Sequence, residues 1–175
     1  MKNILLVIDM QNDFIDGVLG TQEARYIVPH VLEKIKDFDG DIWFTQDTHF
    51  ENYPETQEGK HLPVSHCIKG SDGWELHPEV AVLCLERGAH GIEKSSFGSK
   101  DLPQELQKNY PKGITSITLI GLCTDICVIS NALLLKAFFP ETPIIVDSFC
   151  CAGVTPDGHR NALKAMKTCQ IIIES

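Results

Sequence analysis

The stretch Ile114-Thr-Ser-Ile-Thr-Leu-Ile-Gly-Leu-Cys-Thr-Asp-Ile-Cys127 leads from a buried strand into a helix. Its first half, Ile114–Ile120, is apolar and rich in β-branched residues, which predicts a strand. Beyond it, apolar residues recur at helical spacing from Val128 to Leu135, so we expect a helix over Thr124–Phe139 with Thr124 as its N-cap.

This arrangement places Cys127 in the first turn of the expected helix. Unpaired backbone N–H groups and the positive end of the helix dipole favour a thiolate there, which is the form a nucleophilic cysteine needs. The alternative interpretation is that Cys127 is a small buried hydrophobic residue, as many cysteines are. Residues elsewhere in the chain have to decide between the two.

Strand-like and helix-like segments alternate along the rest of the sequence. Further strands are expected at Ile4–Ile8, Asp41–Thr45, Val80–Leu85, Gly91–Lys94, Pro143–Asp147 and Gln170–Ile173. Further helices are expected at Tyr26–Phe38, Pro156–Lys167 and Leu102–Asn109, the last with Asp101 as its cap. Short apolar strands separated by helices predict a three-layer α/β/α sandwich with a mainly parallel central sheet. Catalytic groups in such folds gather at the carboxyl ends of the strands.

The size and charge of the chain narrow the possible functions. Its 175 residues suit a single domain over 1–175, and 43% hydrophobic and 22% charged residues are ordinary globular values. A formal net charge of -9 argues against binding to nucleic acid or to an anionic membrane surface. No apolar run is long enough to span a bilayer, and the N-terminus is typical of a first strand rather than a signal peptide. Seven scattered cysteines, an odd number, favour a reduced, cytoplasmic protein.

Two charged residues are candidates to act with Cys127. Asp9 follows the apolar run Ile4–Ile8, where a carboxylate is costly unless it is paired or functional; the alternative is that it caps the next turn. Lys94 is a cation that would stabilise a nearby thiolate, although a single lysine is more often a solvated surface group.

A second group of side chains has the composition of a metal site. Asp47 and His49 form an Asp-x-His pair at a strand end, and His66 follows in a long polar region at about residues 46–79. Two nearby ligands and a third from a later loop suit a divalent metal, although His49 could instead cap a turn. Glu58 is a possible fourth ligand, with Glu51 and Glu55 as competitors. The length of this region also predicts a lid or binding loop.

Five stretches together resemble the isochorismatase-like cysteine hydrolases, and within them most closely the nicotinamidase branch. They are Asp9-Met-Gln-Asn-Asp-Phe14, Asp47-Thr-His49, Pro63-Val-Ser-His-Cys67, Lys94-Ser-Ser-Phe97 and Gly121-Leu-Cys-Thr-Asp-Ile-Cys127. The resemblance extends over essentially the whole chain.

The resemblance implies a role for each candidate residue. Cys127 would be the nucleophile of a triad with Asp9 and Lys94. The backbone N–H groups of Cys123 and Cys127 would form the oxyanion hole, which in the family depends on a cis peptide, here Leu122–Cys123.

The resemblance also implies a cofactor and a substrate. Asp47, His49 and His66, with Glu58 as a possible addition, would hold Zn²⁺, or alternatively Mn²⁺ or Fe²⁺. The substrate would be a small amide, nicotinamide above all, contacted by Phe14, Leu62 and Phe97, and a homo-oligomer would be expected.

One departure from the family pattern concerns the substrate ring. Leu62 stands where nicotinamidases often have an aromatic residue, so Tyr53, Trp74 or Phe97 would have to stack on the ring instead. Two other hypotheses remain at this point: a different small-amide or carbamoyl hydrolase, and a ligand-binding or redox protein whose thiols only pack or oxidise.

Overall fold

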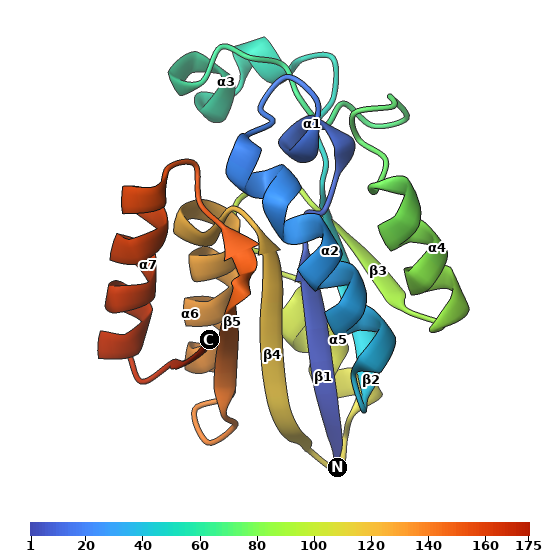
Figure 1. Cartoon of the computed structure of the whole chain (residues 1–175), viewed down its shortest axis with the longest axis vertical. Helices are drawn as coiled ribbons and strands as arrows, with labels where there is room; N and C mark the ends of the chain where they lie inside the picture. The colour runs from blue at the N-terminus through green and yellow to red at the C-terminus, as the bar shows by residue number, and fades with distance from the viewer.

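The computed structural model describes residues 1–175 as a central sheet of six strands with helices on both sides (Figure 1). The strands are β1 (Lys2–Ile8), β2 (Asp41–Asp47), β3 (His90–Lys94), β4 (Ile114–Leu122), β5 (Ile144–Ala152) and β6 (Ile172–Glu174). They lie in the order β3-β2-β1-β4-β5-β6, and every neighbouring pair is parallel. The expected three-layer α/β/α sandwich is confirmed.

Helices and short turns connect the strands. The α-helices are α1 (Asn12–Ile15), α2 (Gln22–Asp37), α3 (Gln57–His61), α4 (Pro78–Glu86), α5 (Leu102–Asn109), α6 (Ile129–Phe138) and α7 (Pro156–Thr168). A 3₁₀ turn spans Tyr53–Glu55 (η1), and a π turn spans Thr124–Val128 (η2). None of these helices combines the length and the apolar character needed to cross a membrane.

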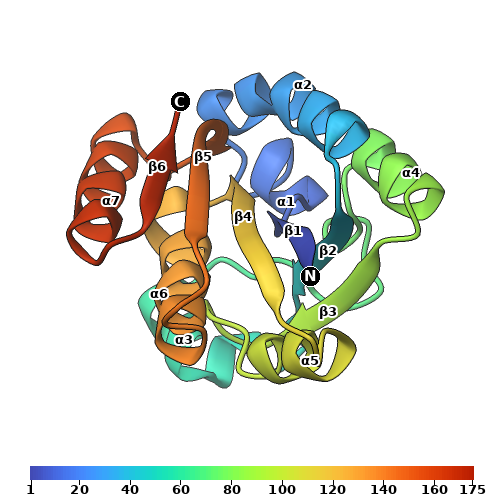
Figure 2. The same cartoon turned by 90° about the horizontal axis from the view of Figure 1, so that it is seen from below.

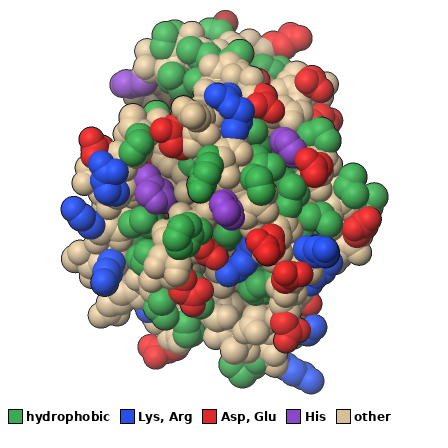
Figure 3. Space-filling view, in the orientation of Figure 1, with side chains coloured by type: hydrophobic (Ala, Val, Ile, Leu, Met, Phe, Trp, Pro, Cys, Tyr) green, Lys and Arg blue, Asp and Glu red, His purple; other side chains and the backbone are tan.

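Each face of the sheet has its own core. Helices α2 and α4 cover one face, and α5, α6 and α7 cover the other (Figure 2). Residues Ile4–Ile8 of β1 are fully buried because both faces are covered there, which explains their unbroken apolar run. Over the face shown in Figure 3, acidic and basic side chains are interspersed, with hydrophobic side chains between them.

The two central strands approach unusually closely at Gly121. This residue has a φ of 115°, and a Cβ atom built on it would lie 2.1 Å from the carbonyl oxygen of Ile8 in β1. Only glycine fits such a position without strain. The order of the sheet reverses between β1 and β4, and in open parallel sheets ligands bind in the crevice outside such a reversal.

One sequence-based expectation about elements is wrong, and another is correct in extent but not in the type of its first turn. Val80–Leu85 is not a strand but part of α4, where Pro78 starts the helix and Val80 and Cys84 face the core one turn apart. A short apolar run cannot by itself distinguish a strand from a helix. The helix expected over Thr124–Phe139 is a π turn followed by α6.

Of the two expected helix caps, Thr124 is wrong, and Asp101 occupies the cap position without making a side-chain capping bond. Thr124 lies inside the π turn after Cys123, and its hydroxyl group is paired with His159 Nδ1 at 2.8 Å rather than with a backbone N–H. Asp101 is the N-cap residue of α5, as expected, but its side chain makes no capping bond; Ser99 Oγ accepts a hydrogen bond from the Leu102 N–H.

Candidate active site and metal centre

The three candidate catalytic side chains meet at the carboxyl edge of the sheet. Asp9 directly follows β1, Lys94 is the last residue of β3, and Cys127 lies in the π turn after β4. Lys94 Nζ lies 2.7 Å from Asp9 Oδ2 and 3.4 Å from Cys127 Sγ. All three residues are buried, with exposed fractions of 0% for Asp9, 4% for Lys94 and 6% for Cys127. The alternatives of a turn-capping Asp9 and a solvated surface Lys94 are therefore excluded.

The ammonium group of Lys94 has more acceptors than protons. It donates hydrogen bonds to Asp47 Oδ1 at 2.9 Å, to the Ser96 carbonyl at 3.0 Å and to Cys127 Sγ at 3.4 Å. Asp9 Oδ1 accepts a 2.6 Å bond from Thr45 Oγ1, whereas Oδ2 has the ionic contact with Lys94 but no aligned hydrogen-bond donor. Asp9 Oδ2 is therefore the oxygen of this cluster that is available to accept a proton.

Burial changes the acidity of all three groups. Burial, and then the Asp9 carboxylate, raises the pKa of the Cys127 thiol well above its usual value, and Lys94 opposes this only in part. Burial likewise raises the pKa of Asp9. Burial alone would lower the pKa of Lys94, but Asp9, Cys127 and Asp47 raise it well above its usual value. Burial and the Asp9 charge thus favour a thiol over the expected thiolate in the free site, since they outweigh the effect of the helix end.

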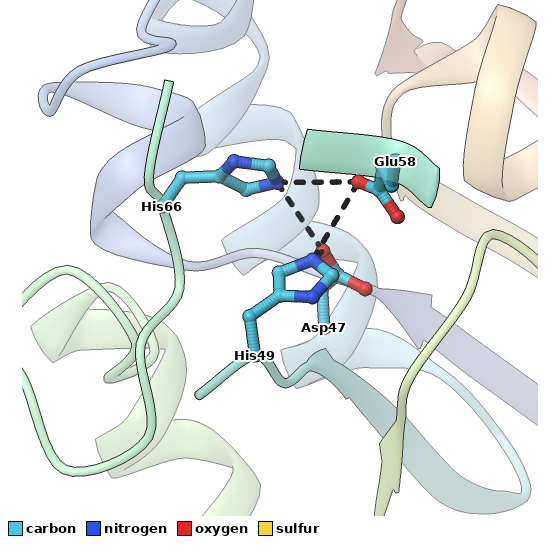
Figure 4. A group of neighbouring side chains, drawn as sticks. All are labelled: Asp47, His49, Glu58 and His66. Atoms are coloured by element: carbon cyan, nitrogen blue, oxygen red, sulfur yellow. Dashed lines mark hydrogen bonds and ion pairs between the residues drawn. The ribbon is translucent and has the colours of Figure 1, made fainter. Parts of the chain in front are cut away.

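The expected metal ligands form a second cluster beside the first. Ligand atoms of Asp47, His49, Glu58 and His66 all lie within 4.8 Å of one another. Asp47 and His49 come from the end of β2, Glu58 from α3 and His66 from the loop after it, and the four side chains point toward one another (Figure 4). Glu51, which competed with Glu58 in the sequence, is exposed and lies outside the cluster.

The donor atoms of this cluster suit a divalent transition metal. His49 Nε2 lies 2.8 Å from Asp47 Oδ2, and His66 Nε2 lies 3.6 Å from the same oxygen. His66 Nδ1 lies 2.8 Å from the Val64 carbonyl, which fixes the hydrogen on Nδ1 and leaves the Nε2 lone pair facing the cluster. Two imidazole nitrogens and two carboxylate groups are ligands that Zn²⁺, Mn²⁺ and Fe²⁺ accept.

The charge of Asp47 is strongly stabilised. Burial alone would raise its pKa, but hydrogen bonds from His49 and His66 and the charge of Lys94 hold it far below its usual value. Asp47 is therefore ionised at neutral pH, as a metal ligand must be.

A cavity of about 250 Å³ joins the two clusters. Cys127 and Cys123 line one part of it, and Asp47, Glu58 and His66 line another. The expected substrate residues Phe14, Leu62 and Phe97 are all in its wall. Tyr53 and Trp74, the other candidates for ring stacking, are not. A larger cavity, of about 500 Å³, lies between α2, β5 and α7 and contains none of these residues.

Residues 3–175 match the isochorismatase domain family. The chain belongs to this family. It is 32% identical over 179 residues to an uncharacterized isochorismatase family protein, PncA, of Bacillus subtilis, with 93% of each chain covered. It is 26% identical over 180 residues to the nicotinamidase/pyrazinamidase of Mycobacterium tuberculosis, with 95% of each covered. The crystal structure of the pyrazinamidase of Pyrococcus horikoshii in complex with zinc matches it with a TM-score of 0.82 and 26% identity, covering 99% of this chain and 98% of that one.

Several residues of this isochorismatase-family site were not anticipated from the sequence. Thr45 holds Asp9, and the parallel register that pairs Ile8 with Thr45 could have indicated this contact. Four further residues line the cavity: Leu19, Thr21, Ile126 and Val154. They have no distinguishing pattern in the sequence, because which loop side chains line a cavity depends on how the loops pack.

Proposed function

We propose that this chain is a metal-assisted cysteine amidohydrolase that converts nicotinamide and water to nicotinate and ammonia. The observation that carries the proposal is the contact of Lys94 Nζ with both Asp9 Oδ2 and Cys127 Sγ, at 2.7 and 3.4 Å, beside a cavity that the metal-type cluster also lines. The named nicotinamidase and pyrazinamidase relatives support the choice of substrate.

The residues of the triad would act in a fixed order. Asp9 accepts the proton of the Cys127 thiol, and the thiolate attacks the amide carbon to form a tetrahedral oxyanion. The backbone N–H groups of Cys123 and Cys127 are the proposed donors to that oxyanion, and the cis peptide Leu122–Cys123 supports this assignment. Asp9 then protonates the leaving nitrogen, ammonia departs, and a thioester remains on Cys127.

Water then hydrolyses the thioester, with Asp9 again accepting and returning a proton. Asp9 accepts a proton from the water as its oxygen attacks the thioester carbon, and the carbon–sulfur bond breaks to give nicotinic acid, which loses its carboxyl proton to solvent as nicotinate. The proton on Asp9 returns to Cys127. Lys94 remains charged throughout, since its pKa is raised, and it balances the negative charge that Asp9 and the thiolate share.

The residues proposed to hold the metal are Asp47, His49, His66 and Glu58. Zn²⁺ is the first choice, given this donor set and the zinc in the Pyrococcus horikoshii pyrazinamidase structure, and Mn²⁺ and Fe²⁺ are the alternatives. When bound, the metal supplies a Lewis acid that can hold the pyridine nitrogen of the substrate, directly or through water.

The remaining candidate residues are assigned to substrate contact because they line the cavity. Phe14, Leu62 and Phe97 are proposed to contact the ring of the substrate, since all three line the cavity. Leu62 and Phe97 have exposed fractions of 38% and 46%, which suits the rim of an entrance. The segment 46–79 is proposed as the metal-binding and lid region of a single domain over 1–175, because it contains all four proposed ligands.

Location and assembly are part of the proposal. Seven free cysteines support a cytoplasmic protein, and the net charge of -9 is the reason to expect no nucleic-acid partner. Tyr26 and Phe149, two exposed aromatic side chains that line the same cavity between α2 and β5, support a homo-oligomer. Size-exclusion chromatography with light scattering would test the assembly.

The decisive experiment is ammonia release from purified protein over a panel of amides, with and without a strong chelator. Nicotinamide should be hydrolysed, and chelation should reduce the rate. If another small amide or a carbamoyl compound is the better substrate, the triad assignment stands and the nicotinamide assignment falls. If no amide releases ammonia with the metal-loaded protein, the proposed activity is wrong.

A further inference from the structure

The middle of the stretch Asp9-Met-Gln-Asn-Asp-Phe14 has no part in the proposed chemistry. Asp9 and Phe14 supply the base and a cavity wall, whereas Gln11 does not line the cavity. Its side chain is nevertheless fully buried, with an exposed fraction of 0%. A buried carboxamide is costly unless its donors and acceptor are satisfied, so its partners indicate why it is there.

Gln11 is bonded to both sides of one residue, Asp47. The Asp47 backbone N–H donates to Gln11 Oε1 at 2.7 Å, and Gln11 Nε2 donates to the Asp47 carbonyl at 2.9 Å. The second hydrogen on Nε2 goes to the Trp74 carbonyl at 2.8 Å. Because two antiparallel bonds hold the groups on either side of the Asp47 Cα, they fix the direction in which its side chain leaves the backbone.

The direction of the Asp47 side chain matters because its two oxygens serve different groups. Oδ1 lies 2.9 Å from Lys94 Nζ, and Oδ2 lies 2.8 Å from His49 Nε2. A small rotation of the Asp47 backbone would break one of these contacts. Gln11 is thus the residue that holds the backbone at the junction of the two clusters.

The residues next to Gln11 bind the same segment further along. Asn12 Nδ2 donates to the Asp72 carbonyl at 2.8 Å, and Asp13 Oδ2 accepts the Cys67 backbone N–H at 2.8 Å, one residue after His66. This short stretch therefore contacts the metal-type segment near its first ligand and near its last.

We infer that Gln11 is a positioning residue, which orients Asp47 so that one carboxylate serves the metal and Lys94 together. The inference rests on the proposed metal site and adds a residue that the ligand set itself does not contain. Residues that orient metal ligands commonly change metal affinity or activity by about 10- to 100-fold when they are replaced.

Two substitutions at Gln11 and one matched control isolate the bonds to Asp47. Gln11→Glu keeps the side-chain size but places an oxygen against the Asp47 and Trp74 carbonyls. Gln11→Met keeps the length, adds no charge and removes all three hydrogen bonds. Gln46→Glu is the control, since Gln46 Nε2 donates to the same Trp74 carbonyl at 3.1 Å while its side chain has no bond to Asp47.

The measurements are zinc affinity of chelator-stripped protein, the visible spectrum of the Co²⁺-loaded protein and thermal unfolding without metal. Both Gln11 variants should bind zinc about 10- to 100-fold more weakly than the unchanged protein and should alter the cobalt spectrum. Gln46→Glu should resemble the unchanged protein in both. The cobalt spectrum is the decisive readout, because a loss of stability alone would leave the geometry at the metal unchanged.

Each other outcome overturns a defined part of the inference. If both Gln11 variants have the zinc affinity and the Co²⁺ spectrum of Gln46→Glu, Gln11 does not position Asp47, even if the melting temperature falls. If Gln11→Glu does not fold, Gln11→Met alone decides by the same criteria, and if neither folds the inference is wrong, because Gln11 is then needed for folding itself. If the unchanged protein binds no divalent metal, the proposed metal site fails and this inference fails with it.

Discussion

Lys94 Nζ lies 2.9 Å from Asp47 Oδ1, while the other oxygen of Asp47 lies 2.8 Å from His49 Nε2. The cluster of Asp9, Lys94 and Cys127 and the metal-type cluster therefore share a carboxylate. A substitution at Lys94 should therefore alter the metal-type cluster, and a substitution at His49 should alter the Lys94 cluster, because both residues interact with the same buried carboxylate. The predictions that follow test each side and the link between them.

Replacing the nucleophile should separate the two cysteines of the cavity wall. Cys127→Ala should lower ammonia release by at least about a thousandfold, since no other thiol contacts Lys94. Cys123→Ala should retain substantial activity, because its proposed contribution is a backbone N–H. Initial rates with nicotinamide measure both, with unfolding curves to verify folding. Near-normal turnover by Cys127→Ala would rule out the triad.

Removing the cation should reduce stability as well as activity. Lys94→Met leaves Asp9 and Asp47 as buried carboxylates without their common partner, a kind of change that typically costs about 3–5 kcal/mol in the free energy of unfolding. Lys100→Met breaks a solvent-exposed pair with Asp101 and should change stability little. Urea unfolding compares the two variants. Equal midpoints would mean that the buried cluster does not depend on Lys94.

Metal content should depend on His66 but not on His61, another histidine of the same region. His66→Ala removes a buried ligand and should lower bound zinc strongly. His61→Ala is the control, because His61 is an exposed residue of α3 outside the ligand cluster. Elemental analysis after dialysis measures both. Zinc retained by His66→Ala at the level of the control would exclude His66 as a ligand.

The substrate should be distinguished by its ring nitrogen. Nicotinamide and pyrazinamide should both react, whereas benzamide, which has the same amide but no ring nitrogen, should have a far lower kcat/KM. Holding the ring correctly positions the amide carbon over Cys127, and positioning is a large part of catalysis. Equal kcat/KM values for benzamide and nicotinamide would show that the metal does not contact the ring, and Leu62 would then mark a different amide.

The pH profile should report the raised pKa of Asp9. Asp9 must be ionised to accept the thiol proton, and burial raises its pKa above the ordinary 3.8. Activity should therefore be present above the raised pKa and be lost as the pH falls through it, at a higher pH than for an ordinary carboxyl group. A kcat/KM profile with nicotinamide measures this limb. A limb centred at or below the ordinary value would contradict Asp9 as the base.

The parts of the fold that the sequence could predict are those with long or distinctive patterns. The apolar run before Asp9 and the strand before Gly121 predicted burial on both faces, and the structure buries Ile4–Ile8 and Ile117–Ile120. The run Val80–Leu85 was misassigned because six apolar residues fit a strand as well as a helix, and only packing against α2 decides between them.

The sequence could predict which residues form the candidate site, but not which of their side chains contact one another. The positions of Asp9 and Cys127 at strand ends predicted that they would lie at the same edge of the sheet, and the family resemblance implied that Lys94 would join them. That Asp47 joins Lys94 to the histidines was not predictable, because it depends on which way one side chain leaves the end of β2. The raised pKa of Cys127 was missed for a similar reason, since the effects of burial and of the Asp9 charge appear only once the residues are packed.

The close approach at Gly121 has a consequence for how the site tolerates change. Asp9 directly follows Ile8, and Cys127 lies in the turn that begins after β4, so the backbone contact between Ile8 and Gly121 fixes the spacing of the two strands that lead to the proposed base and nucleophile. A spacing set by main-chain atoms does not depend on side-chain rotamers. Substitution of a cavity-lining residue such as Leu62 should therefore alter which amide is accepted while the spacing of β1 and β4 stays the same.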